Sequence, residues 1–236
     1  MTAYRSIRAA LVLLGSLLAT TACNAKAGTA APLPAPVLDA PRVAASGQQT
    51  AVVAGGCFWG IQAVFQHVKG VISATSGYSG GSAKTAKYEI VSTGETGHAE
   101  SVEIVYDPSQ ITYGELLRIF FSVAHDPTQL NRQGPDEGTQ YRSSIFYAND
   151  EQKRIAEAYI TQLDKAGIFP RPVVTNVVPL QAFYPAEAYH QDYLLLHPHQ
   201  PYIAFEDMPK VEALERLFPE AWRPDAVTVL PQKPAS

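Results

Sequence analysis

The sequence predicts a two-layer α+β domain, a sandwich in which helices pack on a central sheet that is mixed or antiparallel. Strand-like and helix-like segments alternate along the 236 residues, so both element types are required. Several connections are too short to hold a crossover helix, which argues against a doubly wound parallel sheet. A hydrophobic content of 46% is ordinary for a globular protein of this length.

The first folded elements surround a cysteine. A short apolar run at 51–54 leads into Gly-Gly-Cys-Phe-Trp-Gly at 55–60, and a helical apolar pattern continues from there. This order predicts a strand, a glycine turn and a helix, with Cys57 at or next to the first helical position. Unpaired N–H groups and the helix dipole at that position favour a thiolate. A small buried structural cysteine is the alternative, and local features support both about equally.

The next strands and loops follow from alternation and turn signals. Further strands are predicted at 71–75, 101–106, 141–147 and 173–178. The glycine-rich stretch 77–81 should form tight turns, and a long polar loop should occupy 125–140.

Two longer helices carry clear start signals. Thr112 and Glu115 have the spacing of a capping box in front of an apolar helix. Asn149 should cap the following helix, which Gly167 ends. The chain after the last strand, including a short helix near 211–218, should wrap around the outside of the domain.

The N-terminus has the pattern of a signal peptide over residues 1–23. Two arginines precede an apolar run that is shorter than the roughly 20 residues needed to span a bilayer. The run ends in a small residue and Cys23, which resembles a bacterial lipoprotein signal, although Thr20 stands where that motif usually has Leu. Ordinary cleavage after Ala27 is the alternative. The pattern predicts export to the periplasm or cell envelope, with a membrane tether through Cys23 if that residue is lipidated.

Composition divides the rest of the chain. Residues 24–49 are rich in Ala and Pro and predict a flexible linker. The globular domain should extend over residues 50–222, and residues 223–236 should form a loose C-terminal tail.

Charge and cysteine content exclude several classes of function. The net charge of −4 and the lack of a basic stripe argue against nucleic acid as a partner. Cys23 and Cys57 are the only cysteines, too few for a disulfide framework or a zinc cluster. His190, His197 and His199 lie close together in the sequence, but no further ligand has convincing spacing, so no metal site is predicted.

Other polar positions allow several kinds of chemistry. Glu100 enters a predicted strand, where burial would raise its pKa and let it act as an acid; a solvated turn is the simpler interpretation of the local pattern. A hydrolase or acyltransferase could pair Cys57 with His98 or His125, although nothing in the spacing requires it. A lipid-tethered module that binds a thioether or sulfoxide side chain is the non-enzymatic alternative.

Many blocks of the sequence, in order and spacing, resemble the peptide methionine sulfoxide reductase A family, over about residues 51–218. They are Gly55-Gly56-Cys57-Phe58-Trp59-Gly60, Gly77-Tyr78-Ser79-Gly80-Gly81, Tyr88, Thr96-Gly97-His98-Ala99-Glu100, Tyr106-Asp107-Pro108, His125-Asp126-Pro127-Thr128, Asn131-Arg132-Gln133-Gly134, Gly138-Thr139-Gln140-Tyr141-Arg142-Ser143, Tyr189-His190-Gln191-Asp192-Tyr193 and Pro201-Tyr202-Ile203.

The resemblance implies a ferredoxin-like core and reduction of methionine S-sulfoxide, free or in oxidised proteins, as a repair activity. Cys57 would attack the sulfur and become a sulfenic acid, and Glu100 would supply the proton. The matching substrate-binding positions are Phe58, Trp59, Tyr88, Asp136 and Tyr141. The family resemblance implies no bound cofactor or metal, and we expect a monomer.

The sequence departs from the family pattern in three respects. Gln62 stands where Glu is frequent and receives no role, and Phe121 stands where Trp is frequent, which predicts a change of packing. Many relatives carry resolving cysteines in the C-terminal tail, whereas residues 221–236 contain none. An external thiol, either a thioredoxin-like or glutaredoxin-like protein or a small thiol, should therefore reduce the Cys57 sulfenic acid directly.

Overall fold

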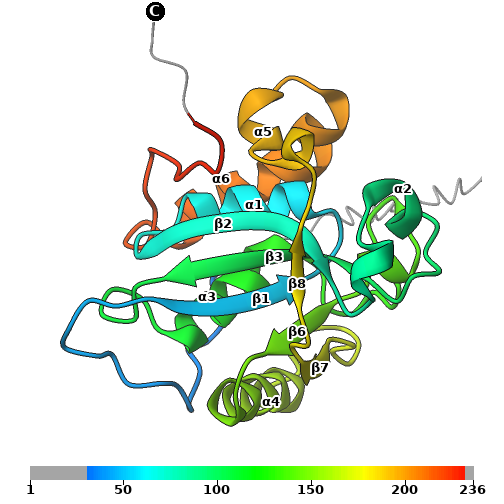
Figure 1. The fold of residues 1–236 in the computed structure, drawn as a ribbon. Coiled ribbons are helices and arrows are strands. Elements are labelled where there is room, and N and C mark those ends of the chain that lie inside the picture. Colours follow the sequence, from blue (N-terminus) through cyan, green and yellow to red (C-terminus); the bar gives the residue numbers. More distant parts are fainter. Residues whose placement is uncertain (1–30, 232–236) are drawn as a thin grey trace, which may run out of the picture.

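A computed structural model describes residues 31–231, and a mixed six-stranded sheet forms its centre (Figure 1). The strands are β1 (Gln49–Ala54), β2 (Val71–Ser79), β3 (Ala99–Tyr106), β6 (Ser144–Tyr147), β7 (Asn176–Pro179) and β8 (Phe183–Pro185). Their order is β7-β6-β1-β3-β2-β8, in which β6 and β7 are parallel and the other neighbours are antiparallel. The α+β class and the mixed sheet are confirmed.

The helices and a small hairpin complete the fold. The longer helices are α1 (Phe58–Gln66), α3 (Tyr113–Ile119), α4 (Asp150–Lys165) and α6 (Met208–Leu217). The short ones are α2 (Tyr88–Val91) and α5 (Tyr193–Leu196). Two π-helical turns (Phe120–Ala124 and Ile203–Asp207) adjoin α3 and α6, and β4 (Arg132–Gln133) pairs with β5 (Asp136–Glu137).

The helices pack on one face of the sheet. Along β1, Ala51 and Val53 belong to the main apolar core, which also holds buried residues of α1, α3, α4 and α6. Val52 and Ala54 point the other way, into a smaller cluster with Phe146. Because side chains alternate along a strand, this division places one face of the sheet under the helices. Phe121 is buried in the main core, in an edge contact with the ring of Tyr159.

The predicted helix signals are present. The Thr112 side chain accepts the backbone N–H of Glu115 while the Glu115 carboxylate accepts the backbone N–H of Thr112, which is a complete capping box. Asn149 Oδ1 accepts the N–H of Gln152, and Gly167 ends the helix with φ at 60°. Helical structure continues after α3 to residue 124, with its last turn in the π form.

One turn is misplaced in the sequence prediction, because β2 continues through Gly77 to Ser79. The glycine serves a close approach of chains there: a Cβ at Gly77 would lie 2.3 Å from the Phe183 ring and 2.5 Å from the Tyr184 carbonyl oxygen on β8. The turn begins at Gly80, whose φ of 99° suits glycine.

The described part of the predicted flexible linker is docked on the domain, so that prediction is wrong from residue 31 onward. Residues 32–42, which we call the strap, lie against α3 and α4. Leu33 is 2% exposed, its N–H donates to Ser122 Oγ, and its carbonyl oxygen accepts Arg118 Nε. The Tyr159 hydroxyl donates to the Pro34 carbonyl oxygen at 2.9 Å. Specific contacts of this kind offset the conformational entropy that the strap loses when it is ordered, which composition alone does not reveal.

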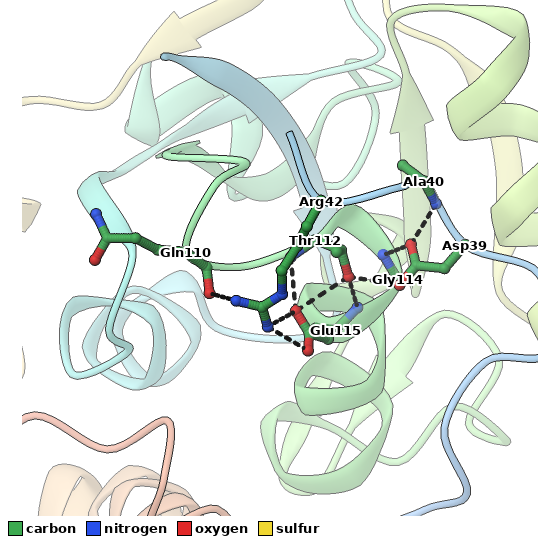
Figure 2. Close-up of polar contacts among 7 residues, drawn as sticks. All are labelled: Asp39, Ala40, Arg42, Gln110, Thr112, Gly114 and Glu115. Atoms are coloured by element: carbon green, nitrogen blue, oxygen red, sulfur yellow. Dashed lines mark hydrogen bonds and ion pairs between the residues drawn. The ribbon is translucent and has the colours of Figure 1, made fainter. Parts of the chain in front are cut away.

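The strap also binds the first turn of α3, as Figure 2 shows. Asp39 accepts the backbone N–H of Gly114 at 2.7 Å and the Thr112 hydroxyl. The Arg42 guanidinium donates to both oxygens of Glu115 and to the Gln110 carbonyl oxygen. An aspartate at the positive end of a helix is favourable, so the strap supplies a second cap to α3.

The predicted loose tail is likewise fixed over its described part. The Val227 N–H donates to the Gln66 carbonyl oxygen, and the N–H groups of Val229 and Leu230 donate to the Asp192 carboxylate. The predicted signal peptide, with Cys23, and the last five residues lie outside the described residues. Within residues 31–231, none of the helices combines the length and apolar character of a membrane span.

Candidate active site

Cys57 lies between β1 and α1, as predicted, and is the N-cap residue of the helix. Its side chain is 8% exposed and its thiol is free. Gly56 has a φ of 100°, which favours glycine, and a Cβ at Gly55 would lie 2.8 Å from the His125 ring. The two glycines therefore let the chain turn sharply enough to place the thiol at the helix start.

The resting thiol is protonated, contrary to the expectation that the helix start would favour a thiolate. Burial raises the pKa of Cys57 well above its usual value, and the nearby carboxyls of Glu100 and Asp207 raise it further. The backbone N–H of Trp59 and the ammonium group of Lys210 lower this pKa, but they do not offset burial. The helix start and the Lys210 ammonium group together are therefore not enough to ionise the resting thiol.

Glu100 lies on β3 next to the first turn of α1. Its side chain is 2% exposed, and its Oε2 accepts the backbone N–H of Phe58 at 3.1 Å. Burial raises the pKa of Glu100 to about 8; the Phe58 N–H lowers it, and Asp136 and Asp207 raise it. The carboxyl is therefore largely protonated at neutral pH, as an acid must be, and the solvated-turn interpretation is wrong.

Tyr88, Asp136 and Tyr141 come from three separate segments and lie around Cys57 and Glu100. Burial raises the pKa of Tyr141, and Glu100, Asp136, Cys57 and Tyr88 each raise it further, which requires all of these groups to lie near one another. Burial also raises the pKa of Tyr88, with smaller effects from Glu100 and Cys57. The fold thus gathers hydroxyl groups and carboxyls around one thiol.

The two residues after Cys57 are aromatic and pack against rings of the segment 190–193. The Phe58 ring is buried, 5.1 Å from the His190 ring. The Trp59 ring stacks on Tyr193, with centroids 3.8 Å apart and planes at 9°, and its Nε1 donates to His190 Nδ1 at 3.2 Å. These contacts hold the Phe58 and Trp59 rings in one orientation, and we call the two rings the aromatic wall.

Tyr202, which sequence reasoning gave no individual role, joins two parts of the site. Its hydroxyl donates to Asp136 Oδ2, and its ring meets the Trp59 ring edge-on at 6.1 Å. Burial is the main cause of the raised pKa of Asp136. The only sequence signal for Tyr202 was its place in the Pro201-Tyr202-Ile203 block.

The segment 189–193 was expected on the outside but is partly buried beside α1. Gln62 donates through Nε2 to the Gln191 side chain at 2.8 Å, and its Oε1 accepts the Asp192 N–H at 3.0 Å. Gln191 also bonds the backbone of Ser76 on β2. Gln62, which had no predicted role, therefore holds in place the segment that carries His190 and Tyr193.

Neither His98 nor His125 serves Cys57 as a base. His98 Nδ1 accepts the Gly81 N–H, and its Nε2 bonds the Ser82 carbonyl oxygen. His125 Nε2 bonds Ser143 Oγ at 2.8 Å, its Nδ1 bonds the Phe120 carbonyl oxygen, and burial lowers its pKa to about 3. With both ring nitrogens of each histidine engaged elsewhere, the geometry does not favour a Cys-His hydrolase.

Over residues 31–231, no three His, Cys, Asp or Glu side chains gather into a group that could hold a metal ion. The chemistry available is that of a thiol, a protonated carboxyl and tyrosine hydroxyls. Such a set can attack an electrophilic atom and protonate an oxygen attached to it.

Comparisons with known proteins agree with this chemistry. A family model described as peptide methionine sulfoxide reductase matches residues 49–221. The peptide methionine sulfoxide reductase MsrA 2 of Mesorhizobium japonicum is 62% identical, and the match covers 79% of this chain and 96% of that protein. The MsrA 2 of Synechocystis is 53% identical, and the match covers 79% of this chain and 88% of that protein. Among solved structures, methionine sulfoxide reductase A of Corynebacterium diphtheriae has a TM-score of 0.57 at 38% identity, covering 72% of this chain and 85% of its own.

Proposed function

Since the chain belongs to the peptide methionine sulfoxide reductase family and is an oxidoreductase acting on sulfur groups, we propose that it reduces methionine S-sulfoxide, free or in proteins, through Cys57. The contact between Glu100 and the first turn of the Cys57 helix carries the proposal. A buried thiol beside a carboxyl with a pKa of about 8 can attack sulfur and protonate oxygen in one event.

The bonds and protons of this step balance. The Cys57 sulfur attacks the sulfoxide sulfur while Glu100 gives its proton to the sulfoxide oxygen and takes up the proton that the thiol loses. Glu100 passes this second proton to the same oxygen, which leaves as water as the sulfur–oxygen bond breaks. Water then attacks the Cys57 sulfur and returns a proton to Glu100; the sulfur–sulfur bond breaks, and Cys57 becomes a sulfenic acid. The substrate is reduced to the methionine thioether, and the cysteine is oxidised by the same number of electrons.

The surrounding side chains would orient the substrate. Tyr88, Tyr141 and Asp136 surround Glu100 and can hold the sulfoxide oxygen or support the pocket, while Phe58 and Trp59 can pack on the methyl group. The stacking of Trp59 on Tyr193 and its hydrogen bond to His190 support a rigid wall for that purpose.

External thiols would restore the enzyme. One thiol condenses with the sulfenic acid to a mixed disulfide and water, and a second releases Cys57 while a disulfide of the reductant forms. Cys57 is the only free cysteine among residues 31–231, which supports recycling without a partner cysteine in the domain. The reductant would be a thioredoxin-like or glutaredoxin-like protein or a small thiol.

Two finer features belong to the same proposal. The inner strands and helices follow one another as β1-α1-β2-β3-α3-β6 and lie in the order β6-β1-β3-β2, which supports a ferredoxin-like core. The sequence pattern of residues 1–23 supports export to the periplasm or cell envelope, either lipid-anchored through Cys23 or free. The mass of the mature N-terminus distinguishes the two.

A direct assay tests the proposed function. The protein is incubated with methionine S-sulfoxide and dithiothreitol, and methionine is measured, with the Cys57→Ser variant as the matched control. We expect turnover by the wild type and none by the variant. Absence of turnover by the folded wild-type protein contradicts the proposal.

A further inference from the structure

An ion pair lies beneath the first turn of α1. Asp207 ends the π-helical turn before α6, and Lys210 lies in the first turn of α6. Lys210 Nζ donates to Asp207 Oδ1 at 2.8 Å, and the two side chains are 17% and 0% exposed. Buried ion pairs seldom add net stability, because desolvation offsets their attraction, so this pair calls for another explanation.

The pair is pressed against α1 close to Cys57. A Cβ at Gly60 would lie 2.2 Å from Asp207 Oδ1 and 2.9 Å from Lys210 Nζ, so only glycine admits both groups there. Gly60 follows Cys57 by one helical turn and lies on the same side of the helix. The fold therefore places an ammonium group against the turn that carries the nucleophile.

Asp207 is not fully satisfied by its partner. Its Oδ2 is buried and has no hydrogen-bond partner among the described residues. A buried carboxylate oxygen without a partner is costly, so the pair is poorly optimised as a purely structural link between α1 and α6.

The charged groups around Cys57 are unevenly distributed. Carboxyls face it from Glu100 on β3 and Asp207 before α6, and Lys210 is the cation that acts on it. Asp136 on β5 raises the pKa of Glu100 and of Lys210, and Glu206 raises the pKa of Asp207. Burial keeps His125 neutral. The hydroxyl groups that also feel the Cys57 charge belong to Tyr88, Tyr141 and Tyr202. Lys210 is thus the cation available to compensate a negative sulfur.

We propose that Lys210, which Asp207 fixes against Gly60, is a positioning residue that compensates the negative charge arising on the Cys57 sulfur during attack. Asp207 holds the ammonium group in place and opposes its effect on the sulfur. The inference rests on the proposed role of Cys57 as the nucleophile and adds a residue that acts on it without touching the substrate.

The test measures the ionisation of Cys57 without sulfoxide reduction. The rate at which iodoacetamide alkylates Cys57 is followed against pH in the full-length protein by mass spectrometry of the Cys57 peptide. We expect Lys210→Met to move the profile to higher pH by about one unit or more, and Asp207→Asn to move it to lower pH. Lys210→Arg should retain the wild-type profile, and Lys153→Met, which removes a surface lysine on α4, is the matched control.

Opposite displacements in the Lys210→Met and Asp207→Asn variants support the proposal, as does a reductase kcat/KM lowered about tenfold in Lys210→Met. Displacements in the same direction, or none, overturn it and leave the pair a structural link. If Lys210→Met does not fold, the neutral double variant Asp207→Asn/Lys210→Met must give a profile above that of Asp207→Asn alone. Lack of turnover in the wild type would contradict the proposed function, while the alkylation profiles would still decide the role of Lys210.

Discussion

The backbone N–H of Phe58 donates to Glu100 Oε2 at 3.1 Å, which joins the residue after Cys57 to the buried carboxyl. Through this one bond, the position of the carboxyl is tied to the start of α1. Cys57 and Glu100 lie 43 positions apart in the chain, and the pairing of β1 with β3 brings their strands together.

Replacement of Glu100 by Gln should abolish most activity without disturbing the fold. The amide oxygen can still accept the Phe58 N–H, but the side chain cannot give its proton to the sulfoxide oxygen. We expect kcat/KM for methionine S-sulfoxide to fall by about a hundredfold or more. Glu103→Gln, on the same strand, is the control and should retain activity. An unchanged rate in Glu100→Gln means that another group is the acid.

The same substitution should change how stability depends on pH. In the unfolded chain Glu100 ionises near 4.5, whereas in the folded protein it stays protonated until about pH 8. Its pKa is raised on folding, so its stabilising contribution is complete below pH 4.5 and is lost as the pH rises to 8. The Tm of Glu100→Gln relative to wild type should increase across this interval and level off above it. A Tm difference that is independent of pH contradicts the raised pKa.

Tyr202→Phe should weaken the site while it preserves the aromatic wall. The variant keeps the ring that meets Trp59 but loses the hydroxyl that donates to Asp136. Because a hydrogen bond to a charged group contributes about 1.5–3 kcal/mol, we expect kcat/KM to fall by about ten- to a hundredfold. Tyr189→Phe, whose side chain is exposed, is the control. Equal kcat/KM values in the two variants would show that the Tyr202 hydroxyl does not contribute to the reaction.

The strap should contribute to stability and not to catalysis. Asp39→Ala removes the bonds to the Gly114 N–H and the Thr112 hydroxyl, and should lower the free energy of unfolding by about 1–2 kcal/mol in urea titrations. Val37→Ala, at a strap residue that is 90% exposed, should have little effect. If Asp39→Ala is as stable as wild type, the strap does not cap α3.

Oxidised Cys57 should be trapped as a sulfenic acid. After one turnover without reductant, we expect dimedone to label Cys57, since the domain offers no second thiol within residues 31–231. Mass spectrometry of the full-length protein locates the label, and Cys57→Ser is the control. A Cys23–Cys57 disulfide in place of the label would show that the chain resolves its own sulfenic acid.

Local sequence signals were enough to predict many of the secondary-structure elements of this protein. The strand, glycine turn and helix around Cys57, the capping box at Thr112 and the cap at Asn149 depend on residues within a few positions of one another, so they were predicted correctly. The motif blocks also indicated which side chains would gather at the site. These features require only backbone preferences and short-range hydrogen bonds.

The tertiary structure decided what depends on distant contacts. Burial and the carboxyls of Glu100 and Asp207 keep Cys57 protonated, although its helix position alone favours a thiolate. The strap and the tail are ordered through Asp39 and Asp192, whose partners lie far away in the sequence. Desolvation and charge coupling arise only when separate segments pack together, so the sequence indicated Cys57 as the candidate nucleophile while the fold set its ionisation.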